Sequence, residues 1–140
     1  MTPALRVLLA EDNPGDVMLV RDALQQQSLE FDLVVVDNGD KIRSFLHTVA
    51  ENQLPGPDVL LLDLNLPRVD GPDMFRLITE HPCCCNVPLI VITSSDSPRD
   101  RAWTEEFGVA HYFRKPSNYD AFMKLGELVR SVVGLKEYKQ

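Results

Sequence analysis

Several features are scarce in this sequence, and their scarcity narrows the possible functions. No apolar run approaches the roughly 20 residues that a membrane-spanning helix needs. The segment from Met1 to Leu5 lacks the basic and apolar pattern of a signal peptide. Positive charge is also scarce, because 14 Lys and Arg residues face 21 Asp and Glu residues and leave a net charge of -7. Since non-specific nucleic-acid binding needs a basic surface, we expect a cytoplasmic protein that binds neither membranes nor nucleic acids.

Cysteine is limited to three consecutive residues, Cys83, Cys84 and Cys85. Adjacent cysteines do not have the spacing of the usual zinc sites, and an odd number cannot pair completely. His81 lies close in the sequence, so weak metal binding stays open as an alternative. The simplest interpretation is a reduced surface loop in a cytosolic protein, and the sequence assigns these residues no role.

Short apolar segments alternate with segments of helical periodicity along the chain. The expected helices begin at favourable caps and prolines, as at Asn13-Pro14 and Ser97-Pro98. Five βα units predict one α/β domain over residues 1–140, a parallel doubly wound sheet with five helices on both faces. Such sheets commonly have the flavodoxin-like order 2-1-3-4-5, with ligands beyond the carboxyl ends of strands 1 and 3. The expected strands cover residues 6–10, 31–36, 59–62, 89–92 and 111–114.

Polar side chains follow four of these strands at the points where the strands end. Glu11 and Asp12 follow the first strand, Asp63 the third, Thr93 the fourth and Lys115 the fifth. Each of these residues alone is ordinary, because acidic residues after strands are usually turn or cap residues and a single lysine is usually on the surface. The carboxyl ends of parallel strands meet at one edge of the sheet, however, so we expect these side chains to form one site.

The residue types at this edge favour phosphoryl chemistry at a metal site. Three carboxylates placed together repel one another, and a cation relieves the repulsion. Oxygen ligands without imidazole or thiolate select Mg²⁺, or Mn²⁺ in its place. A carboxylate such as Asp63 is a competent nucleophile toward phosphorus, while Thr93 and Lys115 are suitable partners for phosphoryl oxygens. The sequence therefore predicts acyl-phosphate chemistry.

The motifs that surround these residues resemble the receiver domains of bacterial two-component response regulators over nearly the whole chain. They cover residues 8–13, 62–67, 70–71, 92–94 and 115–116, in that order. The resemblance implies that Asp63 is the phosphoacceptor. It further implies that Asp12 binds Mg²⁺ directly, that Glu11 binds it through water and that Asn65 offers its backbone carbonyl.

By the same resemblance, Thr93 and Lys115 hold the phosphoryl oxygens, Tyr112 is the switch aromatic, and the bond before Pro116 is cis. The implied donor is the phosphohistidine of a sensor histidine kinase. Such a protein is a phosphoacceptor in signalling rather than an enzyme with an external substrate, although it catalyses its own phosphorylation and slow dephosphorylation. The alternative for Tyr112 is a half-buried strand aromatic without a switching role.

A narrower resemblance points to the small regulators that partner bacterial phytochromes. It rests on the segments 11–16 and 63–67 and on the long connection 51–58. Members of that group typically lack an output domain, so we expect the signal to leave through protein contacts. The receiver resemblance implies that the output face consists of the fourth helix, which begins at Ser97-Pro98, the fifth strand (residues 111–114) and the last helix, and that this face can form homodimers. Trp103 on the charged fourth helix either packs against the core or anchors an interface.

Three other functions are weaker alternatives. A hydrolase or phosphotransferase with an aspartyl-phosphate intermediate usually has a cap domain and a second aspartate two positions after the nucleophile. This chain has Asn65 there, and an amide cannot act as a general acid. A degenerate receiver that is never phosphorylated does not need the full set of site residues. A flavodoxin-like cofactor binder needs a glycine-rich or hydroxyl-rich loop after the first strand, which this sequence lacks.

Overall fold

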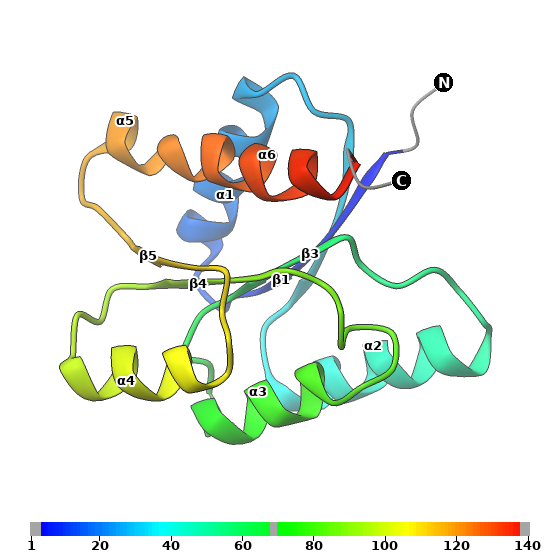
Figure 1. The fold of residues 1–140 in the computed structure, drawn as a ribbon. Helices are drawn as coiled ribbons and strands as arrows, with labels where there is room; N and C mark the ends of the chain where they lie inside the picture. Colours follow the sequence, from blue (N-terminus) through cyan, green and yellow to red (C-terminus); the bar gives the residue numbers. More distant parts are fainter. Residues whose placement is uncertain (1–3, 68–69, 138–140) are drawn as a thin grey trace.

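The computed structural model describes residues 4–67 and 70–137, which form three layers (Figure 1). Within these ranges a central sheet of five parallel strands has the order β2-β1-β3-β4-β5. The predicted α/β fold and strand order are therefore confirmed. The strands are β1 (Leu5–Ala10), β2 (Phe31–Val36), β3 (Val59–Leu62), β4 (Leu89–Thr93) and β5 (His111–Arg114).

Helices cover both faces of the sheet (Figure 1). One face carries α1 (Pro14–Gln26), α5 (Tyr119–Phe122) and α6 (Lys124–Glu137). The other face carries α2 (Gly39–Glu51), α3 (Gly71–Thr79) and α4 (Pro98–Glu106). The last helix expected from the sequence is divided at Met123 into α5 and α6. None of the helices in the described ranges has the length and hydropathy that crossing a bilayer requires.

Capping side chains lie at the starts of helices that the sequence predicts. Asn13, Asn38 and Ser97 each accept the backbone N–H of the residue three positions ahead, at the starts of α1, α2 and α4. Such caps satisfy N–H groups that have no partner inside the helix. Pro14 and Pro98 occupy the first helical positions, where the missing proline N–H costs no hydrogen bond. The capping residues and prolines therefore explain where these helices begin.

Apart from Arg6 in β1 and Thr93 at the end of β4, the central strands are apolar, because both of their faces are covered. Leu8 and Leu60 pack on the side of α2 and α3, whereas Leu9 and Leu61 pack on the side of α1 and α6. All four side chains are 0% exposed. This alternation follows from the two-residue period of a strand. It holds β1 and β3 rigidly at the centre of the molecule.

Backbone hydrogen bonds continue past the strand ends and align the polar residues that follow. The N–H of Glu11 donates to the carbonyl of Val36 at 3.0 Å, and the N–H of Asp63 donates to the carbonyl of Ala10 at 3.0 Å. The N–H of Lys115 donates to the carbonyl of Thr93 at 2.7 Å. The residues that follow β1, β3 and β5 are thus brought to one edge of the sheet, beside the end of β4.

Gly126 in α6 permits a close approach to α1. A Cβ atom at this position would overlap the carbonyl oxygen of Ala23 and lie 2.9 Å from Cγ of Gln27. Gly134 lies in the same helix, and a Cβ atom there would meet nothing within 4 Å. A substitution at Gly126 therefore tests the packing of α6 on α1, whereas one at Gly134 tests only the helix propensity of the residue.

We expect Gly126→Ala to lower the free energy of unfolding by about 1–3 kcal/mol, because the added methyl group forces α6 away from α1. Gly134→Ala should instead raise it by about 0.5–1 kcal/mol, since alanine loses less backbone entropy in a helix. Urea unfolding followed by circular dichroism measures both changes. Equal effects of the two substitutions would contradict the close packing of α1 and α6.

Candidate functional site

Buried polar groups gather at the carboxyl edge of the sheet. In the described part of the chain four polar or charged residues are buried, and three of them lie here: Glu11 at 1% exposure, Asp63 at 3% and Thr93 at 0%. Asp12 lies beside them and is exposed. Burial of charged groups is costly unless they are paired or bind a cation, and it is concentrated at functional sites. The site predicted from the strand ends is therefore brought together by the fold.

Lys115 joins three carboxylates in this cluster. Its Nζ atom lies 2.6 Å from Oε1 of Glu11, 2.8 Å from Oδ2 of Asp16 and 2.8 Å from Oδ2 of Asp63. Burial alone would lower the pKa of Lys115, but its hydrogen bonds to Asp16, Asp63 and Glu11 raise this pKa above the ordinary value. The lysine is therefore charged and ties α1 to the ends of β1 and β3.

Asp16 is a site residue that sequence reasoning did not single out. It lies in the first turn of α1, where its own N–H donates to Oδ1 of Asn13 at 3.1 Å. An acidic residue there is usually explained by the positive end of the helix dipole, so the sequence contained no separate signal. The structure adds a contact with Lys115 and makes Asp16 a fourth carboxylate of the site.

The acidic residues fit a divalent cation. Carboxylate oxygens of Glu11, Asp12 and Asp63 all lie within 4.8 Å of one another. With Asp16 the site contains four carboxylates, and Lys115 contributes one ammonium group to balance their charge. Oxygen ligands and an excess of negative charge are what Mg²⁺ and Mn²⁺ require. The predicted set of carboxylate ligands is therefore assembled, whereas a ligand role for the backbone carbonyl of Asn65 stays a prediction.

Glu11 has a strongly raised pKa. Burial raises its pKa to about 7, with the hydrogen bond from Lys115 acting in the opposite direction and the charge of Asp63 raising it further. Its Oε2 atom also accepts the backbone N–H groups of Asp12 at 3.1 Å and Asn13 at 3.2 Å. A metal ligand must be deprotonated, so cation binding and the ionisation of Glu11 are linked.

We expect the affinity for Mg²⁺ to rise as the pH increases toward 7 and to level off above it. Below the raised pKa, Glu11 holds a proton that cation binding must release, so the affinity should change by roughly tenfold per pH unit there. Calorimetric titration with Mg²⁺ at several pH values measures this slope. Glu11→Gln is the matched control, because it has no proton to lose and should bind more weakly with a flatter profile. An equal slope in both proteins would contradict the assignment to Glu11.

Thr93 and Tyr112, the two predicted switch residues, are connected through one intermediate residue. Oγ1 of Thr93 accepts the N–H of Ser95 at 3.1 Å and Nδ2 of Asn65 at 3.4 Å. The carbonyl of Ser95 in turn accepts the hydroxyl of Tyr112 at 2.9 Å. Arg101 covers the Tyr112 ring at 4.3 Å, and burial raises the pKa of the phenol. Hydrogen bonds through the β4–α4 loop therefore connect Thr93 to Tyr112, whereas their switching role stays a prediction.

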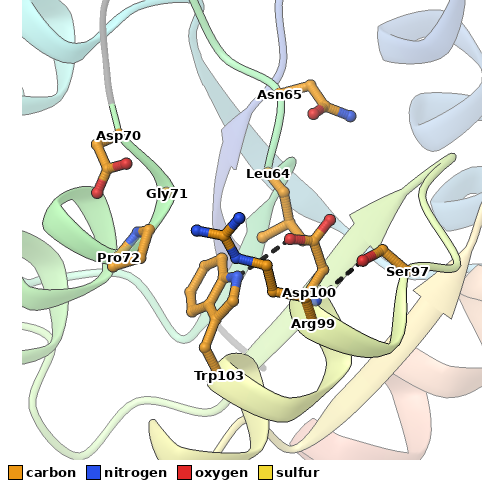
Figure 2. Close-up of a pocket in the computed structure, with 9 residues that line it drawn as sticks. All are labelled: Leu64, Asn65, Asp70, Gly71, Pro72, Ser97, Arg99, Asp100 and Trp103. Atoms are coloured by element: carbon orange, nitrogen blue, oxygen red, sulfur yellow. Dashed lines mark hydrogen bonds between the residues drawn. The ribbon is translucent and has the colours of Figure 1, made fainter.

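A second branch of this network leads to Trp103. Oγ of Ser95 donates to Oδ2 of Asp100 at 2.7 Å. Nε1 of Trp103 donates to Oδ1 of the same carboxylate at 3.1 Å (Figure 2). The indole also packs edge-on against Phe75, with ring centroids 5.0 Å apart. Trp103 is therefore packed against the core, which was one of the two roles that the sequence left open.

A cavity of about 330 Å³ lies beside the carboxylate cluster, between the starts of α3 and α4. Leu64, Pro72 and Trp103 line it (Figure 2), and so does Asn65, whose N–H donates to Oδ1 of Asp63 at 3.0 Å. Glu11, Asp12 and Asp63 do not line it. The carboxylates thus lie at the edge of the sheet, next to this cavity, and are not among its lining residues.

The expected cis bond before Pro116 is wrong for this structure, because the described residues contain no cis peptide bond. Lys115 reaches Glu11, Asp16 and Asp63 with a trans bond after it, so these contacts do not require the cis form.

Sequence comparisons connect this site to known proteins. A family model described as the response regulator receiver domain matches residues 7–126. Response regulator Rcp1 from Synechocystis is 30% identical over 92% of this chain and 88% of its own length. Transcriptional regulatory protein TrcR from Mycobacterium tuberculosis is 34% identical over 94% of this chain but only 45% of its own length. This chain therefore spans about half of TrcR.

Solved structures agree with the sequence comparisons. The phosphorylated cyanobacterial phytochrome response regulator RcpA superposes with a TM-score of 0.80 and 26% identity, over 92% of this chain and 93% of that chain. The Mn²⁺-bound form of Rcp1 superposes with a TM-score of 0.78 and 30% identity, over 91% and 92% of the two chains. In one of these relatives, therefore, the same fold holds a divalent cation.

Proposed function

Since this chain belongs to the response regulator receiver family, we propose that it accepts a phosphoryl group on Asp63 from the phosphohistidine of a sensor histidine kinase. The observation that carries the proposal is the position of Asp63. Its Oδ2 atom lies 2.8 Å from Nζ of Lys115, and its carboxylate belongs to the group of oxygens that fits a divalent cation. A nucleophile, a countercharge and metal ligands are thus in contact at one edge of the sheet.

The roles of the chain's own residues follow from their contacts. A carboxylate oxygen of Asp63 attacks phosphorus, the bond from phosphorus to the imidazole nitrogen breaks, and the imidazole leaves. Asp12, Glu11, Asp63 and the Asn65 carbonyl would hold Mg²⁺ or Mn²⁺. When bound, that cation would neutralise charge on the phosphoryl oxygens. The ammonium group of Lys115 would exchange its hydrogen bond with Asp63 for one with a phosphoryl oxygen. Its ion pairs with Asp16 and Glu11 would keep Lys115 in position.

Thr93 is suited to bind the phosphoryl group once it has been transferred. In both of its hydrogen bonds, to Ser95 and to Asn65, the Thr93 oxygen is the acceptor. Its hydroxyl hydrogen can therefore be donated to a phosphoryl oxygen. In this proposal the chain is a phosphoacceptor that catalyses its own phosphorylation and slow dephosphorylation, and it is not an enzyme that acts on an external substrate.

Incubation with acetyl phosphate and Mg²⁺ should add one phosphoryl group to the wild-type protein, as measured by intact mass. Asp63→Asn should abolish the addition, because the amide is no nucleophile, and chelation of the cation should slow the addition greatly. Asp40→Asn is the matched control, since Asp40 is an exposed aspartate on α2 and its loss should leave the rate unchanged. A wild-type protein that gains no phosphoryl group would favour a degenerate receiver.

We propose that the switch runs from Thr93 through Ser95 to both Tyr112 and Trp103. Movement of the Thr93 hydroxyl toward a phosphoryl oxygen would change its bond with the Ser95 N–H. Ser95 is bonded to Tyr112 by its carbonyl and to Asp100 by its hydroxyl, so both branches respond together. Such a change is a shift between two packings of one fold.

Trp103 is the only tryptophan of the chain, so its fluorescence reports on this network. Addition of beryllofluoride and Mg²⁺, which mimics phosphorylation, should change the Trp103 emission of the wild-type protein. Thr93→Ala should still be phosphorylated on Asp63 but should lose most of the fluorescence response, along with the dependence of partner affinity on phosphorylation. Thr48→Ala, at an exposed position of α2, is the control and should respond fully. A full response in Thr93→Ala would contradict this switch.

Receiver domains partner with sensor histidine kinases, and we propose that a phytochrome kinase is the partner of this chain in the cytoplasm. The description of RcpA as a phytochrome response regulator supports this proposal. We further propose that residues 1–140 form one receiver domain that signals through contact with another protein. The natural face is formed by α4, β5 and the last helix, which consists of α5 and α6, because Tyr112 connects it to the phosphorylation site.

The face of α4, β5 and the last helix carries charged side chains that favour a symmetric contact. Asp96 pairs with Arg101 of α4 at 2.9 Å and with Arg114 of β5 at 3.4 Å. Exchange of such pairs between two copies would join them across a twofold axis. We therefore propose self-association through this face, strengthened by phosphorylation.

Light scattering after size exclusion should show more dimer with beryllofluoride and Mg²⁺ than without them. Arg114→Glu should weaken the dimer, because the reversed charge would repel Asp96. Arg43→Glu, on the exposed face of α2, is the matched control and should have no effect. A monomer in both states would reject the dimer and leave contact with a different protein as the output.

A further inference from the structure

The three consecutive cysteines lie at the opposite end of the sheet from Asp63. They belong to the connection between α3 and β4, at the amino end of β4, whereas the carboxylate site lies beyond the carboxyl ends of the strands. The expectation of a surface loop is wrong for Cys84, whose side chain is only 1% exposed and belongs to the same apolar cluster as Phe75 and Ile78. Cys83 is half-buried and Cys85 is exposed.

The side chains of Cys83 and Cys84 point to the same side. Their Sγ atoms are 3.3 Å apart, although neighbouring side chains in an extended chain point in opposite directions. Sγ of Cys85 is instead directed to the carbonyl of Pro82, at 3.6 Å. The pair at 83 and 84 is therefore distinct from the third thiol.

Backbone contacts hold this pair in place. The N–H of Cys83 donates to Nδ1 of His81 at 3.2 Å, and the N–H of Cys84 donates to the carbonyl of His81 at 2.9 Å. Gly56 packs on the other side, where a Cβ atom would lie 2.7 Å from the carbonyl oxygen of Cys83. Two hydrogen bonds to His81 and the packing of Gly56 thus hold the turn that brings the two thiols together.

We propose that Cys83 and Cys84 are a modification site at which a peroxide forms a reversible disulfide between adjacent residues. The Cys83 sulfur, which is the more accessible one, attacks a peroxide oxygen and becomes a sulfenic acid while water leaves. The Cys84 sulfur then displaces the hydroxyl of the sulfenic acid as a second water. In total, two thiols and one hydrogen peroxide give one disulfide and two waters.

The geometry of adjacent residues makes this disulfide labile. Their Cα atoms are about 3.8 Å apart across a trans peptide, which is shorter than the roughly 4.4–6.8 Å of ordinary disulfides. A strained bond of this kind is easily reduced by a thiol, which suits reversible modification rather than a permanent cross-link. Bond formation also draws Sγ of Cys84 away from its position in the apolar cluster, so the oxidised form should be the less stable one.

Treatment of the full-length folded protein with dilute hydrogen peroxide, followed by intact-mass measurement, tests the proposal. We expect a loss of two hydrogen atoms that dithiothreitol reverses. Cys85→Ser should lose them as the wild type does, whereas Cys83→Ser should not. Because Cys84 is buried, Cys84→Ala is added as a second variant that preserves an apolar side chain, and it should also retain its hydrogen atoms.

Several outcomes would overturn the inference. Addition of oxygen atoms without a loss of hydrogen would show isolated thiols, and retention of both hydrogen atoms in Cys85→Ser would place the bond at Cys85. A covalent dimer would show an intermolecular disulfide instead. Asp63→Asn should form the disulfide as the wild type does, since the pair and the phosphorylation site lie at opposite ends of the sheet.

Discussion

The ion-pair cluster around Lys115 is the interaction on which the site depends. One ammonium group contacts Glu11, Asp16 and Asp63, which come from the end of β1, the first turn of α1 and the end of β3. Without this lysine, the buried carboxylates of Glu11 and Asp63 would face each other uncompensated, a situation that costs several kcal/mol per buried ion. The lysine balances only part of the charge, so the cluster is held together and still attracts a cation and a phosphoryl donor.

The parallel sheet makes this cluster possible. Strands β1 and β3 are covered on both faces and cannot shift independently, while the loops at their carboxyl ends form an edge open to partners. Thr93 belongs to the buried strand β4 and Ser95 to the loop that follows it, so their hydrogen bond connects the sheet to the β4–α4 loop. From Ser95 the hydrogen bonds divide toward Tyr112 in β5 and, through Asp100, toward Trp103 in α4.

Much of this structure could be predicted from the sequence, because local patterns specify it. Apolar runs identified the strands, and caps such as Asn13 and Ser97 identified the helix starts. The rule that ligands lie at the carboxyl ends of parallel strands then predicted that Asp63, Thr93 and Lys115 would meet at one edge. These inferences need only the type of each element and the direction of the chain, and both are encoded in neighbouring residues.

By itself, then, the sequence determined the strands, their order and the polar residues at the strand ends. The tertiary structure alone decided which distant side chains touch. Asp16 and Lys115 are 99 positions apart, and their contact depends on the angle at which α1 leaves the sheet. The burial of Cys84 and the packing of Trp103 on Phe75 depend in the same way on how helices pack on the sheet. No local pattern contains that information, because helix orientation results from the combined packing of side chains from separate elements.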